Sequence, residues 1–176
     1  MSEYLKEGAV DLFMTYKFIR LLTTKWNKTE AFKTGVIDKN GKLLVKGKDQ
    51  TEKQKKSYQL FDKMVFNLQR ILEKVPFGKS QIASYAAALF LLKEETGMAE
   101  EDLIKVLEDL GHDTSMNLNE EFKEIHMGEY ILNHDLMESK KGTIVNLNNI
   151  EPVGQFAGVP IYKTQENIFI SVNNIL

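Results

Sequence analysis

Residues 58–75, YQLFDKMVFNLQRILEKV, decide the fold because they carry the clearest helical pattern in the chain. Apolar residues recur there at steps of three and four and form one stripe: Tyr58, Phe61, Met64, Val65, Leu68, Ile71, Leu72 and Val75. Ahead of the stripe, Thr51 and Gln54 have the spacing of a capping box, and Pro76 ends the pattern. We therefore expect a long amphipathic helix behind Thr51, with this stripe in the core.

Three further helices are expected around this one. Residues 8–24 place Leu12, Phe13, Tyr16, Ile19 and Leu22 at helical spacing, with Lys17 and Arg20 on another face. Ser80 caps the next helix and Gly97 ends it, and its small residues 86–88 allow close approach of another element. A last helix covers about residues 99–110, with acidic residues in its first turn and Gly111 as its C-cap.

Two regions of the chain have sequence patterns typical of β-strands. Residues 34–37 and 42–45 flank 38–41 (DKNG), which predicts a β-hairpin at about 32–48 because Asn-Gly tolerates positive φ. Residues 143–147, 159–162 and 167–172 read as three short strands, the last two joined by a turn at 164–166. We expect an α+β fold: a mainly helical core with a hairpin (1–111), an acidic polar linker (112–142) and a small C-terminal β module (143–176).

Composition excludes several classes of protein. The chain of 176 residues has no cysteine, which excludes disulfides, thiol catalysis and thiolate zinc sites. No run of roughly 18 apolar residues marks a membrane-spanning helix. Acidic Glu3 and Glu7 stand where a secretory signal has basic residues, so we expect a protein used inside a cell, without membrane partners.

The net charge of −2 hides a strong division along the chain. Residues 1–93 carry 18 Lys and Arg against 9 Asp and Glu, whereas residues 94–176 carry 5 Lys against 16 Asp and Glu. The basic part can attract DNA or another nucleic acid, an acidic protein, or the acidic half of a second copy. The two halves can also neutralise each other within one fold.

Cations near the expected hairpin are candidates for contact with nucleic acid. Lysines neutralise phosphates without reading sequence, and an exposed tryptophan adds base stacking. A solvated hairpin and a core tryptophan are the alternative reading. The candidate residues are Lys25, Trp26, Lys39, Lys42, Lys46, Lys48 and, at the start of a helix, Lys79.

No pattern in the sequence fixes a catalytic chemistry. Gly78-Lys79-Ser80 matches the tail of a phosphate-binding loop, but Glu73 stands where that motif needs glycine and a helix precedes it. His112-Asp113, His126 and His134-Asp135 supply the residue types of a metal-dependent hydrolase, but from an irregular acidic stretch. We expect no catalytic residue, no metal and no cofactor, with a hydrolase as the minor alternative.

Two segments of the chain have a recognisable sequence. The first holds residues 16–24 (YKFIRLLTT), 29–38 (TEAFKTGVID), 75–79 (VPFGK) and 83–90 (ASYAAALF). The second holds residues 152–154 (PVG), 158–162 (GVPIY) and 168–171 (IFIS). Together they resemble a family of uncharacterised proteins of T-even-like, especially marine, myoviruses. The resemblance covers residues 10–93 and 150–172, and it implies a tailed-phage protein of the virion or its assembly pathway.

These observations lead to one expected function and one alternative. The first is a non-enzymatic phage structural or assembly protein, in the host cytoplasm or the virion, that binds other phage structural proteins or itself. The alternative is an accessory protein that binds nucleic acid through its basic N-terminal half.

Overall fold

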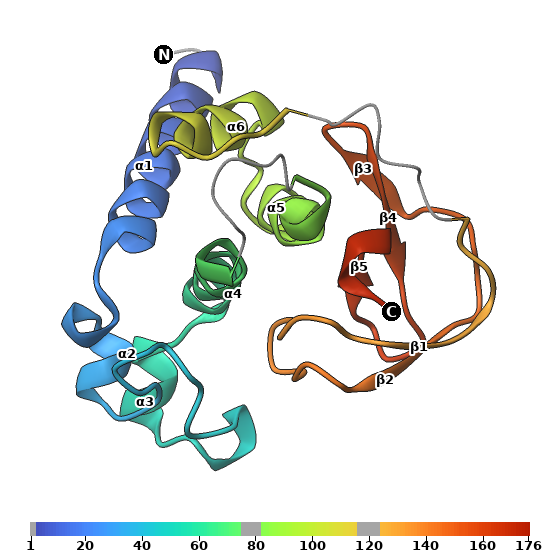
Figure 1. Cartoon of the computed structure of the whole chain (residues 1–176). Coiled ribbons are helices and arrows are strands. Elements are labelled where there is room, and N and C mark those ends of the chain that lie inside the picture. Colours follow the sequence, from blue (N-terminus) through green and yellow to red (C-terminus); the bar gives the residue numbers. More distant parts are fainter. Residues whose placement is uncertain (1–2, 75–81, 116–123) are drawn as a thin grey trace.

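The computed structural model describes residues 3–74, 82–115 and 124–176. Helices and strands occupy opposite sides of the molecule (Figure 1), as the expected α+β class requires. The helices are α1 (Glu3–Thr23), α2 (Glu30–Lys33), α3 (Glu52–Ser57), α4 (Leu60–Lys74), α5 (Ile82–Thr96) and α6 (Glu100–Asp109), with short 3-10 turns η1 (Trp26–Lys28), η2 (Gly47–Asp49) and η3 (Val172–Asn174). None of the helices in the described residues is both long and apolar enough to cross a membrane.

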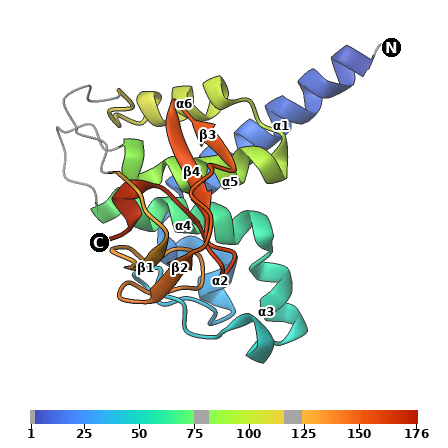
Figure 2. The same ribbon diagram turned by 90° about the vertical axis from the view of Figure 1, so that its right-hand side faces the viewer.

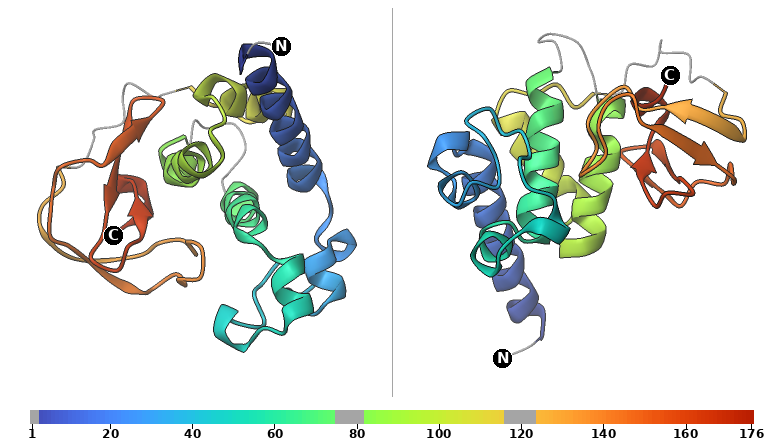
Figure 3. Two further views of the ribbon diagram at one scale, coloured as in Figure 1. Left: turned by 180° about the vertical axis from the view of Figure 1, so that it is seen from behind. Right: turned by 90° about the horizontal axis from the view of Figure 1, so that it is seen from below.

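Helix α5 lies between the other helices and the strands (Figure 3). Its residues 82–90 are all buried, because it contacts α4 and α6 as well as β3, β4 and β5. The small residues 86–88 let these neighbours approach closely. Gly97, at φ +72°, follows α5 as expected, whereas Ser80 lies outside the described residues.

Within the residues that the structure describes, five strands form two antiparallel sheets. β1 (Gly128–Ile131) pairs with β2 (Ile144–Leu147), and the register sets Ile131 opposite Ile144. β3 (Gly154–Phe156), β4 (Val159–Lys163) and β5 (Phe169–Ile170) form the second sheet in that order. Strands at three of these places were expected, and β1 and β3 were not.

The β region shares one core with the helices. Phe156, Ile161 and Ile170 are fully buried in the same cluster as Leu68 and Leu89. The C-terminal turn is tied to α5, because Ser171 Oγ donates to the Ala83 carbonyl and Asn174 Nδ2 donates to the Ser84 carbonyl at 2.8 Å. The strands therefore pack as a layer on α5.

The long helix expected behind Thr51 is interrupted once, between Ser57 and Leu60. Thr51 and Gln54 form the predicted capping box, but α3 ends at Ser57 and α4 begins at Leu60. Tyr58 between them has φ −140° and ψ 65° and is 3% exposed. Its ring stacks on Phe66 at 5.9 Å between centroids, so the break carries Tyr58 into a second small core cluster.

The apolar stripe expected to bury α1 lies largely on the surface instead. Leu12, Phe13 and Tyr16 are 74%, 64% and 63% exposed. The face that packs on the body shares only Leu22 with this stripe: Phe18 and Leu22 are buried, and Met14 and Leu21 are partly buried. The N-terminal end of α1 projects beyond the rest of the molecule (Figure 2).

The N-terminal hairpin is reduced to one antiparallel bridge, Ile37 with Leu43. Its turn has the expected chemistry, with Gly41 at φ +80°. The segment leaves this pairing after Leu44 because its next residues turn into η2 and the Thr51 cap.

The segment 112–142 was expected to be an acidic polar linker, but its second half contains a strand and buried residues. Residues 128–131 form β1, and Leu132 and Leu136 are buried in the main core. Leu136 and Ser139 exchange two backbone hydrogen bonds, of 2.8 and 2.9 Å, around a tight turn. Apolar side chains at 132 and 136 reach the core, which holds this part of the chain in place.

Candidate anion-binding groove

The loop 38–46 is shaped by its own polar groups. The Asp38 carboxylate accepts hydrogen bonds from the backbone N–H groups of Asn40 at 2.8 Å and Lys42 at 2.9 Å. The Lys42 N–H bond, with that of Asn40 and the nearby lysine charges, holds the pKa of Asp38 below its ordinary value although burial opposes it. The side chain of Asp38 thus fixes the turn that presents Lys42.

Trp26 supports this loop from inside the protein. It is only 8% exposed; its Nε1 donates to Glu73 at 2.8 Å, and Phe66 meets its ring edge-on at 5.2 Å between centroids. A Cβ at Gly41 would come within 2.5 Å of the indole, so the loop backbone lies directly on the ring. The expectation that Trp26 stacks on a base fails, because its aromatic surface is already covered by the core.

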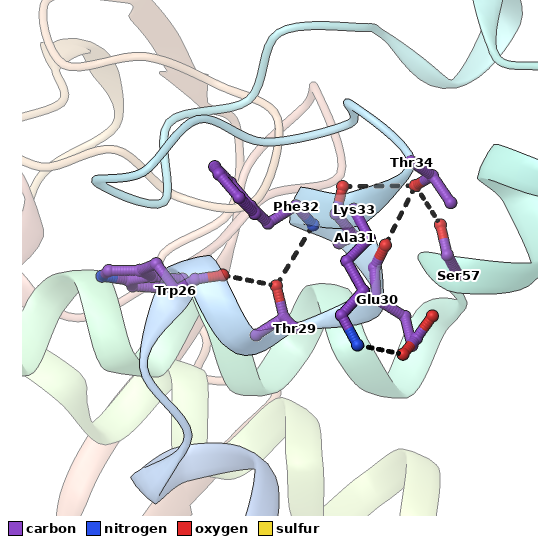
Figure 4. Close-up of polar contacts among 8 residues, drawn as sticks. All are labelled: Trp26, Thr29, Glu30, Ala31, Phe32, Lys33, Thr34 and Ser57. Carbon is purple, nitrogen blue, oxygen red and sulfur yellow. Dashed lines mark hydrogen bonds and ion pairs between the residues drawn. The ribbon is translucent and has the colours of Figure 1, made fainter.

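The residues around Trp26 fix its position through hydroxyl groups (Figure 4). Thr29 Oγ1 donates to the Trp26 carbonyl at 2.7 Å and accepts from the backbone N–H of Phe32 at 3.2 Å. The hydroxyls of Thr34 and Ser57 lie 2.7 Å apart and join α2 to α3. These contacts hold in place Trp26, on which the loop lies at Gly41, together with the neighbouring helices α2 and α3.

A groove of about 410 Å³ separates the loop from the turn 136–139. Its walls come from distant parts of the chain: the loop on one side, residues 135–140 on the other, and the end of α4 between them. Five cations line it, against three carboxylates. We name it the basic groove, and its cations are Lys42, Lys46, Arg70, Lys74 and Lys140.

Each carboxylate of the basic groove already has a donor. Glu73 accepts from the Trp26 indole, Glu138 pairs with Lys63 at 3.7 Å, and Asp135 Oδ1 accepts from the backbone N–H of Lys141 at 2.7 Å. By contrast, no lysine of the groove forms an ion pair with any described residue. The groove therefore has positive charge to offer to an external anion.

Arg70 adds a further charge under the loop. Its Nε donates to the Gly41 carbonyl at 2.6 Å and its guanidinium lies 5.7 Å from the Trp26 ring centroid. Its Nη2 is buried without a hydrogen-bond partner among the described residues, and no carboxylate there forms an ion pair with it. A partly buried charge without a counterion is unfavourable, so an anion in the groove would stabilise it.

His134 is next to Asp135 of the basic groove, and the pKa of its imidazole is lowered. Burial lowers the pKa of its imidazole, and the charges of Lys74 and Lys141 lower it further, while Asp135 opposes them. Two lysines from distant segments therefore act on one side chain.

The sequence-predicted residues are distributed unevenly around this site. Lys42 and Lys46 line the basic groove, while Lys25 and Lys39 line a neighbouring depression that shares Glu73 with it. Lys48 lies in η2 and is not among the described residues that line either hollow, and Lys79 lies outside the described residues.

Sequence reasoning missed the second wall of the groove. Lys74 belongs to the polar face of α4, and Lys140 belongs to the acidic half of the chain. One signal was present: Lys140-Lys141 is the only adjacent pair of cations in residues 94–176. Nothing local, however, indicates that this pair lies opposite Lys42.

The histidine–aspartate pairs do not converge. His112 follows α6, where burial lowers its pKa, whereas His134 lies beside the basic groove. Within residues 3–74, 82–115 and 124–176, no group of three or more acidic or histidine side chains could hold a metal ion. The hydrolase alternative therefore gains no support from the geometry of the described part of the chain.

Comparisons of the chain with protein-family models, with curated proteins and with solved structures find no match. No family, relative or known fold therefore assigns a role to the basic groove.

Proposed function

We propose that this chain is a non-catalytic binding protein that attaches to the phosphate backbone of a nucleic acid through the basic groove. The observation that carries the proposal is the unequal pairing of its charges: every carboxylate of the groove has a donor, while its four lysines pair with no described carboxylate. Lysines placed in this way bind phosphates and release counterions, which needs no sequence readout. Lys25 and Lys39 extend the same basic surface beyond the groove.

The test is binding of labelled oligonucleotides over a series of salt concentrations. Affinity should fall linearly on logarithmic axes, and the slope measures the number of phosphates contacted. The double variant Lys42→Glu/Lys140→Glu should lower that slope by about 1 for each lysine. The matched control is Lys53→Glu/Lys56→Glu on α3, which changes the net charge equally but away from the groove. Equal losses in both variants would mean that overall charge, and not the groove, attracts the nucleic acid.

A second measurement locates the bound phosphate. Since Lys74 and Lys141 lower the pKa of His134, an anion that neutralises them should raise it again. In NMR titrations, the His134 pKa should rise when the oligonucleotide is added. His112, whose pKa is lowered by burial alone, is the internal control and should not move. An unchanged His134 would place the nucleic acid elsewhere.

A second candidate function is assembly into a phage particle, which the resemblance to myovirus proteins suggests. The observation in its favour is the outer face of α1, where Leu12, Phe13 and Tyr16 are exposed on a projecting helix. Residues 12–28 carry Lys17, Arg20, Lys25 and Lys28 and no carboxylate. The partner that fits is an acidic helical segment of another structural protein, held by apolar contacts and oriented by charge.

A further inference from the structure

The basic groove offers apolar surface as well as charge. Leu43, Leu44 and Met137 line it between the lysines, and Leu44 remains 58% exposed. Phosphate contacts alone would leave these side chains in water. A ligand that covers them removes apolar surface from water, which favours binding.

The walls of the groove are held in place before any ligand arrives. Arg70 Nε fixes the loop through the Gly41 carbonyl at 2.6 Å. Opposite, Met137 N–H donates to Asn67 Oδ1 at 2.9 Å, and Asn67 is 4% exposed on α4. These contacts fix the spacing of the walls, so the ligand must fit the existing space.

A nucleic-acid duplex does not fit this shape. It carries its phosphates outside and its bases stacked inside, and proteins read it by inserting a helix or a two-stranded ribbon into its major groove. Here the protein surface is hollow and is lined mainly by a loop and a tight turn. A duplex would meet only the lysines on the rim and leave Leu44 and Met137 uncovered.

We infer that the ligand of the basic groove is single-stranded nucleic acid. Its phosphates lie at Lys42, Lys74 and Lys140, and a base or sugar covers Leu44 and Met137. Single strands are flexible and expose their bases, so one strand can enter a hollow and use charged and apolar contacts together. This inference rests on the proposed function and narrows it to one class of nucleic acid.

The experiment compares three labelled probes of about 12 nucleotides, a length within the range that one small domain occupies. They are an oligomer of thymidine, an oligomer of uridine, and a DNA duplex, each measured at the same salt concentration. The wild-type protein should bind at least one single strand about tenfold more tightly than the duplex. Binding of the duplex as tightly as the better-bound of the two single strands would overturn the inference.

Two variants then separate charge from apolar contact. Leu44→Ser should weaken single-strand binding about fivefold to tenfold and leave duplex binding unchanged, because only the single strand covers this side chain. Leu110→Ser, on a leucine 41% exposed after α6, is the control and should affect neither. The inference would be contradicted if Leu44→Ser weakened the binding of the single strand and the duplex equally, or left the binding of both unchanged. Failure of all three probes to bind at low salt would instead overturn the proposed function itself.

Discussion

Gly41 connects the loop of the basic groove to the core beneath it. Its φ of +80° suits glycine, and the Trp26 indole occupies the space where a Cβ would stand. Gly35 has nearly the same φ, +79°, but nothing within 4 Å of its Cβ position. The two glycines therefore separate the effect of backbone conformation from the effect of contact.

We expect Gly41→Ala to lower the free energy of unfolding by about 3 kcal/mol, since it combines a disfavoured φ with overpacking against Trp26. Gly35→Ala should lower it by only about 1 kcal/mol, for the φ alone. Urea denaturation of both variants measures the difference. If both variants lost the same free energy of unfolding, the loop would be able to move away from the Trp26 indole at no energetic cost.

At the scale of the element, the turn 136–139 depends on one side chain of α4. Asn67 is buried, and its Oδ1 accepts the Met137 N–H across a separation of 70 residues. Met137 itself has φ +54°, an uncommon conformation for a residue with a side chain. The hydrogen bond from Met137 helps to hold the turn in that conformation.

Asn67→Ala should therefore lower the free energy of unfolding by about 1–3 kcal/mol, the usual effect of leaving a buried donor without a partner. It should also speed hydrogen exchange at the amides of residues 136–139, because the wall of the groove loses its anchor. Gln69→Ala is the control: the buried Oε1 of Gln69 has no hydrogen-bond partner among the described residues. If both variants leave the exchange of the turn unchanged, Asn67 does not hold the wall.

The elements differ in how far the sequence could predict them. The stripe of residues 58–75 has one apolar face, and most of it is α4, as expected. In α1, apolar residues occupy two faces, and periodicity does not say whether Phe13 and Tyr16 or Phe18 and Leu22 will be buried. The four residues of strand β1, GEYI, do not alternate between apolar and polar side chains. In the structure they are exposed or half-buried.

The basic groove was harder to predict than the helices and strands. Lysines of the first wall, Lys42 and Lys46, follow from the local run of charge, but Lys74 and Lys140 depend on tertiary packing. For Trp26 the sequence left two readings open, base stacking if exposed or a place in the core, and the structure has the second, since the side chain is buried. A local run of lysines predicts that a surface is basic. The shape of that surface depends on contacts between residues far apart in the sequence, which local patterns do not predict.

The whole molecule presents two surfaces with different chemistry. One is the basic groove, and the other is the apolar outer face of α1, on a helix that extends beyond the body. The α1 face contributes little to the fold, because Phe13 and Tyr16 are mostly exposed. Substitutions there separate assembly from stability.

Phe13→Asp/Tyr16→Asp should change the free energy of unfolding by less than about 0.5 kcal/mol, as is usual for surface positions. If the chain assembles into phage particles through α1, mass spectrometry should detect the wild-type chain in particles purified from infected cells and not the variant. Ile144→Asp, on an exposed strand residue away from α1, is the matched control and should remain in the particles. Absence of the wild-type chain from both finished and immature particles would contradict the assembly function.

The two walls of the groove also set an order of events during synthesis. Translation produces the loop that ends at Lys46 early, but the turn that faces it follows about ninety residues later in the chain. A nascent chain that stops short of residue 135 has its tryptophan-supported loop and four of the five cations of the basic groove, but not the second wall that encloses the hollow. If the groove binds nucleic acid as proposed, that binding has to wait until residues 135–140 have been made and have folded onto α4.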